Sequence, residues 1–177
     1  MTQRVNCWLA VLAAAVPRGG RILEIGTGLG VGLGWLIAGI GARTDISVTT
    51  VESDGARSAH AQETSWPSWV TFEVGDAVEV LPSLGKFDLI FADAEGGKWY
   101  GLDLTIEALA LNGTLVLDDL RPQDWKSTED KDVHLEKVGQ IRAQVLAHPD
   151  LLSIELDHGA GILLSVRRPR PRDHDPI

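Results

Sequence analysis

The chain has 177 residues, of which 44% are hydrophobic and 23% charged, and its net charge is -9. This size predicts one domain, residues 1–166, and a flexible tail, 167–177, where prolines and charges replace apolar residues. The negative charge repels nucleic acid phosphates, and no apolar run is long enough to span a bilayer. The single cysteine, Cys7, excludes an internal disulfide and fits a reducing compartment. We therefore expect a cytoplasmic protein that binds neither nucleic acid nor membrane.

Short apolar runs alternate with helical patterns along the first two thirds of the chain. A first helix is expected over 5–16, ended by Pro17 and the glycines that follow it. Nearly continuous apolar runs are typical of parallel strands that helices cover on both faces. Such runs predict strands at 21–25, 46–51, 70–74, 87–92 and 114–117. The helices predicted between them lie near 30–40, 54–64, 76–83 and 98–111.

The last third of the chain adds one helix and two strands. A polar loop after Asp119 precedes a helix predicted over 131–147, whose apolar side carries Leu135, Val138, Ile141 and Val145. Strands predicted at 151–156 and 161–166 are separated by a turn and form a hairpin. The expected fold is α/β: a doubly wound, mostly parallel seven-stranded sheet with a C-terminal antiparallel hairpin. Ligands of such sheets bind beyond the carboxyl ends of the strands.

The first predicted strand ends in a glycine turn within residues 24–30, with glycines at Gly26, Gly28 and Gly30. Glycine is needed where the backbone takes a positive φ or a ligand approaches closely. The turn therefore predicts a nucleotide site. A dinucleotide fingerprint requires glycine or alanine three residues after the second glycine, and that place holds Val31. A nicotinamide cofactor is accordingly the weaker interpretation.

Acidic residues follow the next three strands. Glu52, beside Ser53, offers a carboxylate that can accept hydrogen bonds from ribose hydroxyls. Asp76 can accept from an adenine amino group, and the backbone N–H of Ala77 can donate to a ring nitrogen. Asp93 closes the fourth strand. Any one of these acids alone could simply cap the following helix. Their succession after the glycine turn favours a ligand site.

With these motifs the chain resembles the class I S-adenosylmethionine (SAM) dependent methyltransferases over nearly its whole length, and the catechol and caffeoyl-coenzyme A type O-methyltransferases most closely. The resemblance implies a Rossmann-like methyltransferase fold and methyl transfer from SAM to a hydroxyl of a small-molecule acceptor. It also implies a cofactor site made from Glu24, Gly26, Thr27, Gly28, Gly30, Glu52, Ser53, Asp76, Ala77 and Asp93.

The resemblance further implies a magnesium-like ion, because that family ligates one with an acid after the fourth strand and an acid followed by asparagine after the fifth. Asp93, Asp118 and Asp119 fall at these places. Asp119 departs from the asparagine of the family, and its extra negative charge changes the electrostatics of such a site. In the alternative interpretation, the last two acids cap the turn that follows them or pair with Arg121.

Lys98 and Asp93 are the candidate catalytic residues. The related enzymes carry a lysine base soon after the metal aspartate, but two glycines precede Lys98 here, so the register is open. A solvated Lys98 in the first turn of a helix is the alternative. The acceptor pocket would draw on the loops at 94–99 and 119–130, with Trp99 and Trp125 as weaker candidates.

Two other classes of function fit part of the pattern. A non-catalytic SAM-binding or interaction protein would keep the cofactor residues but would not need Lys98 or the aspartates. An NAD(P)-dependent oxidoreductase shares the acid after the second strand but lacks the third glycine. The five histidines show no ligand spacing and lie mostly in predicted polar stretches. The acceptor and the methylated atom, oxygen or nitrogen, are left open, and a homodimer is one candidate assembly.

Overall fold

The computed structural model describes residues 7–120 and 128–169. Its helices are α1 (Cys7–Ala15), α2 (Val31–Ile40), α3 (Gly55–Gln62), α4 (Ala77–Leu84), α5 (Leu102–Ala108) and α6 (Thr128–Leu146). Its strands are β1 (Arg21–Ile25), β2 (Ser47–Glu52), β3 (Val70–Val74), β4 (Phe87–Ala92), β5 (Leu109–Leu117), β6 (Leu151–Leu156) and β7 (Ile162–Arg167). They form one seven-stranded sheet in the order β3-β2-β1-β4-β5-β7-β6, which confirms the predicted fold class.

The direction of the strands explains where a ligand can bind. Strands β1 to β5 are parallel, whereas β7 runs antiparallel to both β5 and β6. The strand order reverses between β1 and β4, which are direct neighbours. At such a switch point the loops after the two strands diverge to opposite faces and leave a crevice at the carboxyl ends. The glycine turn after β1 and Asp93 after β4 both lie there.

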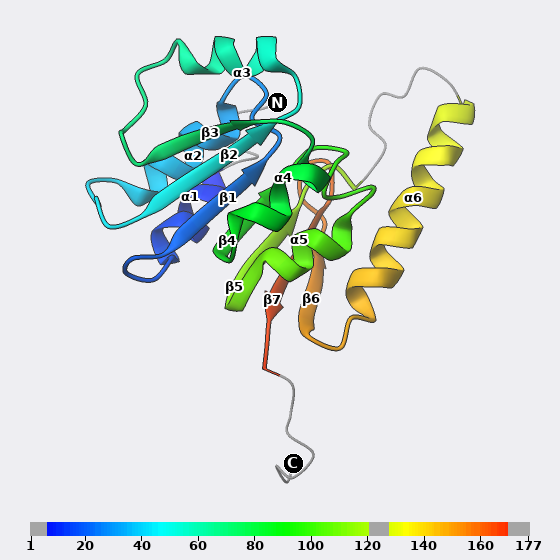
Figure 1. The fold of residues 1–177 in the computed structure, drawn as a ribbon. Helices are drawn as coiled ribbons and strands as arrows, with labels where there is room; N and C mark the ends of the chain where they lie inside the picture. The colour runs from blue at the N-terminus through cyan, green and yellow to red at the C-terminus, as the bar shows by residue number, and fades with distance from the viewer. Residues whose placement is uncertain (1–6, 121–127, 170–177) are drawn as a thin grey trace, which may run out of the picture.

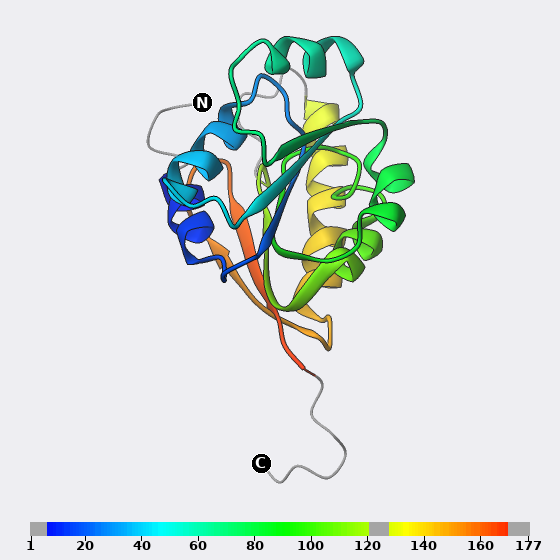
Figure 2. The ribbon, with the colours of Figure 1, turned by 60° about the vertical axis from the view of Figure 1, so that its left-hand side comes forward.

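Helices cover both faces of the sheet, as the continuous apolar strands predict. Helices α1 and α2 pack on one face, and α4, α5 and α6 pack on the other (Figures 1 and 2). Leu36 of α2 and Phe91 of β4 belong to the core on the first face. Ile90 of β4 and Ile106 of α5 belong to the core on the second. Successive β4 residues therefore point to opposite cores, as the pleat of a strand requires.

Close contact between α1 and α2 depends on a glycine. A Cβ built on Gly39 would lie 2.1 Å from the carbonyl oxygen of Ala10. No side chain fits at that distance, so the glycine lets the two helix backbones approach. Leu9 of α1 and Leu33 of α2 share one buried cluster with Ile22 of β1, and α2 begins directly after the glycine turn.

The predicted helix over 98–111 is too long, and this part of the interpretation is corrected. Helix α5 covers only Leu102–Ala108, because Gly97 and Gly101 have positive φ angles of 81° and 72° that no helix accommodates. Strand β5 begins at Leu109, where the backbone becomes extended, and not at residue 114. The apolar spacing predicted a longer helix because Leu109 lies at a helical interval from Ile106, but Leu109 is buried as the first residue of a strand.

The other boundaries differ by a few residues. Helix α6 begins at Thr128, three residues before the predicted start. Strand β7 includes Arg167, which the sequence analysis assigns to the tail. The guanidinium of Arg167 donates to the carbonyl oxygen of Leu109 at 2.7 Å and so joins the end of β7 to the start of β5. Within the described ranges, the helices are too short or too polar to cross a membrane.

Candidate active site

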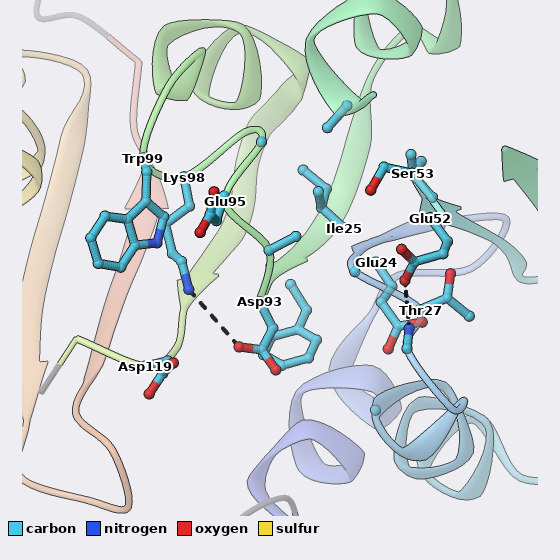
Figure 3. Close-up of a pocket in the computed structure, with 18 of the residues that line it drawn as sticks. Glu24, Ile25, Thr27, Glu52, Ser53, Asp93, Glu95, Lys98, Trp99 and Asp119 are labelled. Atoms are coloured by element: carbon cyan, nitrogen blue, oxygen red, sulfur yellow. Dashed lines mark hydrogen bonds and ion pairs between the residues drawn. The ribbon is translucent and has the colours of Figure 1, made fainter. Parts of the chain in front are cut away.

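A cavity of about 870 Å³ opens at the carboxyl ends of the parallel strands. Figure 3 shows Thr27 and Glu52 at one end and Lys98 and Trp99 at the other, with Asp93 between them. The structure thus gathers side chains from the ends of different strands in a single hollow. Of the predicted site residues, the cavity is lined by Glu24, Gly26, Thr27, Gly28, Glu52, Ser53, Asp76, Ala77, Asp93, Lys98 and Asp119.

Two predicted residues stand apart from the cavity wall. Gly30 has a φ of 81°, and a Cβ built on it would lie 2.8 Å from the ring of Trp66. It therefore serves the packing of Trp66 against the start of α2. Asp118 is 2% exposed, and its side chain lies behind the wall.

The floor of the cavity is the glycine turn. Gly26 has a φ of 102°, and a Cβ there would lie 3.1 Å from the carbonyl group of Asp93. Gly28 has a φ of 53° and open space beside it. The first glycine lets the ends of β1 and β4 approach, and the second leaves the backbone accessible to a ligand.

Glu52 is held rigidly at one side of the cavity. Its side chain is 6% exposed, its Oε2 accepts a hydrogen bond from the Gly28 N–H at 2.9 Å, and its Oε1 accepts from the Asp54 N–H at 3.0 Å. Each carboxylate oxygen keeps a second lone pair for another donor. The carboxylate is therefore a fixed acceptor of the kind that a pair of sugar hydroxyls requires.

Asp76 combines helix capping with a place in the cavity. Its Oδ1 accepts from the Val78 N–H at 3.0 Å as the N-cap of α4, so the capping interpretation is correct for this residue. Its Oδ2 accepts from the Tyr100 hydroxyl at 3.0 Å. Tyr100 lines the same end of the cavity, and sequence reasoning missed it. The Ala77 N–H belongs to the first turn of α4 and has no partner inside the helix.

Glu24 is a fully buried acid directly beneath the cavity. Its Oε2 accepts from the Thr50 hydroxyl at 2.6 Å, and within residues 7–120 and 128–169 its Oε1 has no hydrogen-bond partner. The Thr50 hydroxyl lies 2.6 Å from that of Thr27. Burial raises the pKa of Glu24 to about 8. A positively charged group entering the cavity would favour the ionised form of this carboxyl.

The raised pKa of Glu24 predicts a specific dependence of stability on pH. Between pH 4.5, the ordinary value, and about 8, the folded protein holds a proton on Glu24 that the unfolded chain releases. The free energy of unfolding should therefore fall as pH rises through this window, by at most about 1.4 kcal/mol per pH unit from this group. Glu24→Gln keeps a neutral side chain at every pH and should lose this part of the decline. Urea unfolding of both proteins from pH 5 to 8 measures it, and two parallel curves would contradict the assignment.

Lys98 and Asp93 form the charged centre of the other end of the cavity. Lys98 is only 3% exposed, so it is not the solvated side chain of the alternative interpretation. Its Nζ donates to the carbonyl oxygen of Asp118 at 2.8 Å and lies 3.9 Å from Oδ1 of Asp93, the pair marked in Figure 3. Burial lowers the pKa of Lys98, while the surrounding carboxylates oppose this. Burial also raises the pKa of Asp93 to about 6, and Lys98 acts against that shift.

The three aspartates do not fit a magnesium ion as they lie in this structure. The Asp118 carboxylate turns back onto the chain, where its Oδ1 accepts from the Asp119 N–H at 2.7 Å. The described part of the chain contains no group of three histidine, cysteine or acidic side chains that could hold a metal. The cation that the structure places beside the Asp93 carboxylate is the ammonium of Lys98, 3.9 Å from Oδ1. The Asp118 carboxylate thus caps the backbone of the next residue, and Arg121 and Pro122 of the predicted turn lie outside the described residues.

Helix α6 supplies a wall of the cavity that sequence reasoning missed. His134 is 2% exposed, and its ring lies 4.5 Å from that of Trp99, while Nζ of Lys137 lies 5.0 Å above the same indole. His134 is therefore a buried exception among the histidines, most of which are expected in polar stretches. It occupies the buried face of α6 in place of Leu135, which is 43% exposed. The sequence signal for its burial was its position four residues before Val138, on the same face of the helix.

Trp99 lines the same end of the cavity as Lys98, from the loop before α5. Trp125 lies outside the described residues. The wall that Trp99 forms with His134 and Lys137 is aromatic and basic. It differs from the opposite end, which is lined by the carboxyl groups of Glu24 and Glu52.

A doubly wound sheet whose glycine turn and acidic strand ends share a cavity at the switch point defines a nucleotide-binding domain of the class I methyltransferase type. A family described as a methyltransferase domain matches residues 23–120, more than half of the chain. The chain belongs to this family. The matched segment includes the glycine turn, Glu52, Asp76, Asp93 and Lys98.

Curated relatives support this assignment over part of their length. A candidate O-methyltransferase from Mycobacteroides abscessus is 34% identical over 99 residues, which cover 53% of this chain and 46% of that protein. A probable O-methyltransferase from Mycobacterium tuberculosis is 36% identical over 94 residues, which cover 49% of this chain and 41% of that protein. The matches thus span less than half the length of these relatives.

Solved structures match nearly the whole chain. A candidate O-methyltransferase from Klebsiella pneumoniae is 25% identical with a TM-score of 0.78, over 96% of this chain and 82% of that one. A Podospora anserina methyltransferase bound to S-adenosylhomocysteine (SAH) is 20% identical with a TM-score of 0.79, over 96% of this chain and 80% of that one. The second likeness shows the fold alone.

Proposed function

We propose that the protein is a SAM-dependent methyltransferase that methylates a hydroxyl of a small-molecule acceptor. One observation carries the proposal: Glu52, fixed by two backbone amides, shares a cavity with Glu24, Asp76 and Asp93, above a glycine turn. Membership of the methyltransferase-domain family supports it, as do relatives named O-methyltransferases. These features favour a methyl donor over a nicotinamide cofactor.

The cofactor would extend along the cavity from Asp76 to Asp93. Glu52 accepts hydrogen bonds from the ribose hydroxyls, with Ser53 beside it, while Asp76 and the Ala77 N–H face the adenine edge. The amino-acid part of SAM lies over the glycine turn of Gly26, Thr27 and Gly28. Its ammonium group and sulfonium centre are positive, so the carboxylates of Glu24 and Asp93 stabilise them. The acidic end of the cavity thus matches the charge of the cofactor.

The acceptor would enter at the end lined by Lys98, Trp99 and His134. Transfer requires the acceptor oxygen to lie in line with the methyl carbon and the sulfur. The oxygen forms a bond to that carbon while the carbon–sulfur bond breaks. The electron pair of the broken bond stays on the sulfur of SAH. The hydroxyl proton passes to the carboxylate of Asp93, which lies between the two ends of the cavity. Alignment and removal of this proton are the contributions of the protein.

Turnover with a panel of catechols, phenols, other alcohols and amines tests the proposal. We expect SAH and an O-methylated product from at least one hydroxyl acceptor, and a severe loss of rate in Asp93→Asn. Asp103→Asn is the matched control, because Asp103 is an exposed residue of α5 outside the cavity. Binding of SAM without product from any acceptor would favour the non-catalytic alternative. Thermal stabilisation by NADH and not by SAM would favour the oxidoreductase.

A further inference from the structure

Lys98 is an unusual lysine because it is buried among acids. A side chain with 3% exposure has lost nearly all its water, and a buried ammonium persists only with nearby compensation. Here the compensation is the carbonyl oxygen of Asp118 at 2.8 Å, the carboxylate of Asp93 at 3.9 Å, and the further negative charges of Asp118 and Asp119. The lysine thus pairs with Asp93, donates to the backbone of Asp118, and feels the charges of all three aspartates that the sequence analysis assigns to a metal.

The backbone around Lys98 is built to hold it in this position. Gly97 has a φ of 81°, and a Cβ there would lie 2.9 Å from Oγ1 of Thr105 and 3.0 Å from Cδ1 of Ile25. The Thr105 hydroxyl donates to the Gly97 carbonyl oxygen at 2.7 Å, and the Trp99 N–H donates to the carbonyl oxygen of Glu95 at 2.7 Å. The turn before α5 is therefore tied to that helix, and the ammonium is aimed inward.

We propose that Lys98 is the resident cation at the ends of β4 and β5, in place of a divalent metal ion, and that it holds the acceptor oxygen during methyl transfer. The first part concerns only the residues of this chain. The second part rests on the proposed function. Together they make the reaction independent of added metal.

The chemistry of the ammonium suits this role. It has three N–H donors, one of which goes to the Asp118 carbonyl, and Lys98 also lines the cavity, where another can reach an acceptor oxygen. The oxygen bonds to the methyl carbon as the carbon–sulfur bond breaks toward sulfur, and its proton goes to Asp93. Lys98 keeps its own protons throughout. A fixed positive charge in a dry site stabilises the negative charge that develops on the oxygen.

Manganese binding, followed by the electron paramagnetic resonance signal of free Mn²⁺, tests the first part without any turnover. The wild-type chain should leave the signal unchanged. Lys98→Ser should bind Mn²⁺, because the carboxylates that now surround the ammonium without forming a metal site can turn toward a new cation once the ammonium is removed. Adding Asp93→Asn should abolish that binding. Lys86→Ser, at an exposed lysine outside the cavity, should behave as the wild type does. Wild-type binding that depends on Asp93 would overturn the proposal, as would equal absence of binding in the wild type and Lys98→Ser.

Turnover in the presence of EDTA tests the second part. The wild-type rate should be unchanged by the chelator, while Lys98→Met should lower kcat by about 10²-fold or more with little change in SAH affinity. SAH binding by this variant also shows that it folds. Loss of turnover in EDTA with recovery in magnesium would overturn the proposal, as would wild-type kcat in Lys98→Met. Absence of methyl transfer to every acceptor would contradict the proposed function. The manganese titration does not depend on turnover, so it would still test whether Lys98 is the resident cation.

Discussion

Glu52→Gln should weaken SAH binding by about ten- to a hundredfold for each ribose hydrogen bond that is lost. A hydrogen bond to a charged group contributes about 1.5–3 kcal/mol, and about 1.4 kcal/mol corresponds to a factor of ten. Both oxygens of Glu52 already accept from backbone amides, those of Gly28 and Asp54. Glutamine has only one acceptor oxygen, so its amide nitrogen would face a backbone N–H and the side chain would turn away.

Isothermal titration calorimetry with SAH measures this effect. Glu107→Gln is the matched control, because Glu107 is an exposed residue of α5 that does not line the cavity. Its affinity for SAH should equal that of the wild type. If Glu52→Gln and Glu107→Gln bound SAH equally well, the ribose would have to be recognised elsewhere.

Gly26→Ala should abolish measurable SAH binding and also destabilise the fold. Its φ of 102° lies outside the conformations that alanine readily adopts, a strain of about 1–3 kcal/mol. The new Cβ would also lie 3.1 Å from the backbone of Asp93 and 3.1 Å from Cβ of Ala94. The ends of β1 and β4 would have to separate, which would distort the floor beneath the cofactor.

Gly19→Ala separates the two consequences. Gly19 also has a positive φ, 71°, but a Cβ there meets nothing within 4 Å, and the residue lies outside the cavity. Urea unfolding should show a loss of stability in both variants from backbone strain. Calorimetry should show lost SAH affinity only in Gly26→Ala. Wild-type affinity in Gly26→Ala would mean that the approach of β1 to β4 is not needed for the site.

The fold could be predicted because short local patterns in the sequence indicate each strand and turn. Continuous apolar runs fix the parallel strands, and glycines at Gly26 and Gly28 mark the turn where the backbone takes positive φ. The boundary between α5 and β5 could not be predicted in the same way. Leu109 continues the helical spacing of Ile106. It is as buried as Ile106, although it is the first residue of strand β5. Hydrophobic periodicity alone does not separate these cases.

The site could be predicted where one strand end carries one functional group. Glu52 and Asp76 were found in this way, although Asp76 also caps α4. The position of Lys98 depends instead on Thr105, which ties Gly97 to α5, and no spacing within the loop reveals that contact. His134 was missed because its neighbour Leu135 has the more apolar side chain, whereas packing against Trp99 selects the histidine.

The proposed function requires one adenosine group to bind between Glu52 and Asp76 above the glycine turn. A crystal structure with bound SAH tests it most directly. We expect the ribose hydroxyls within hydrogen-bonding distance of the Glu52 carboxylate and the adenine edge against Asp76 and the Ala77 N–H. SAH bound at another surface, with the Glu52 carboxylate contacting only Gly28 and Asp54, would contradict it.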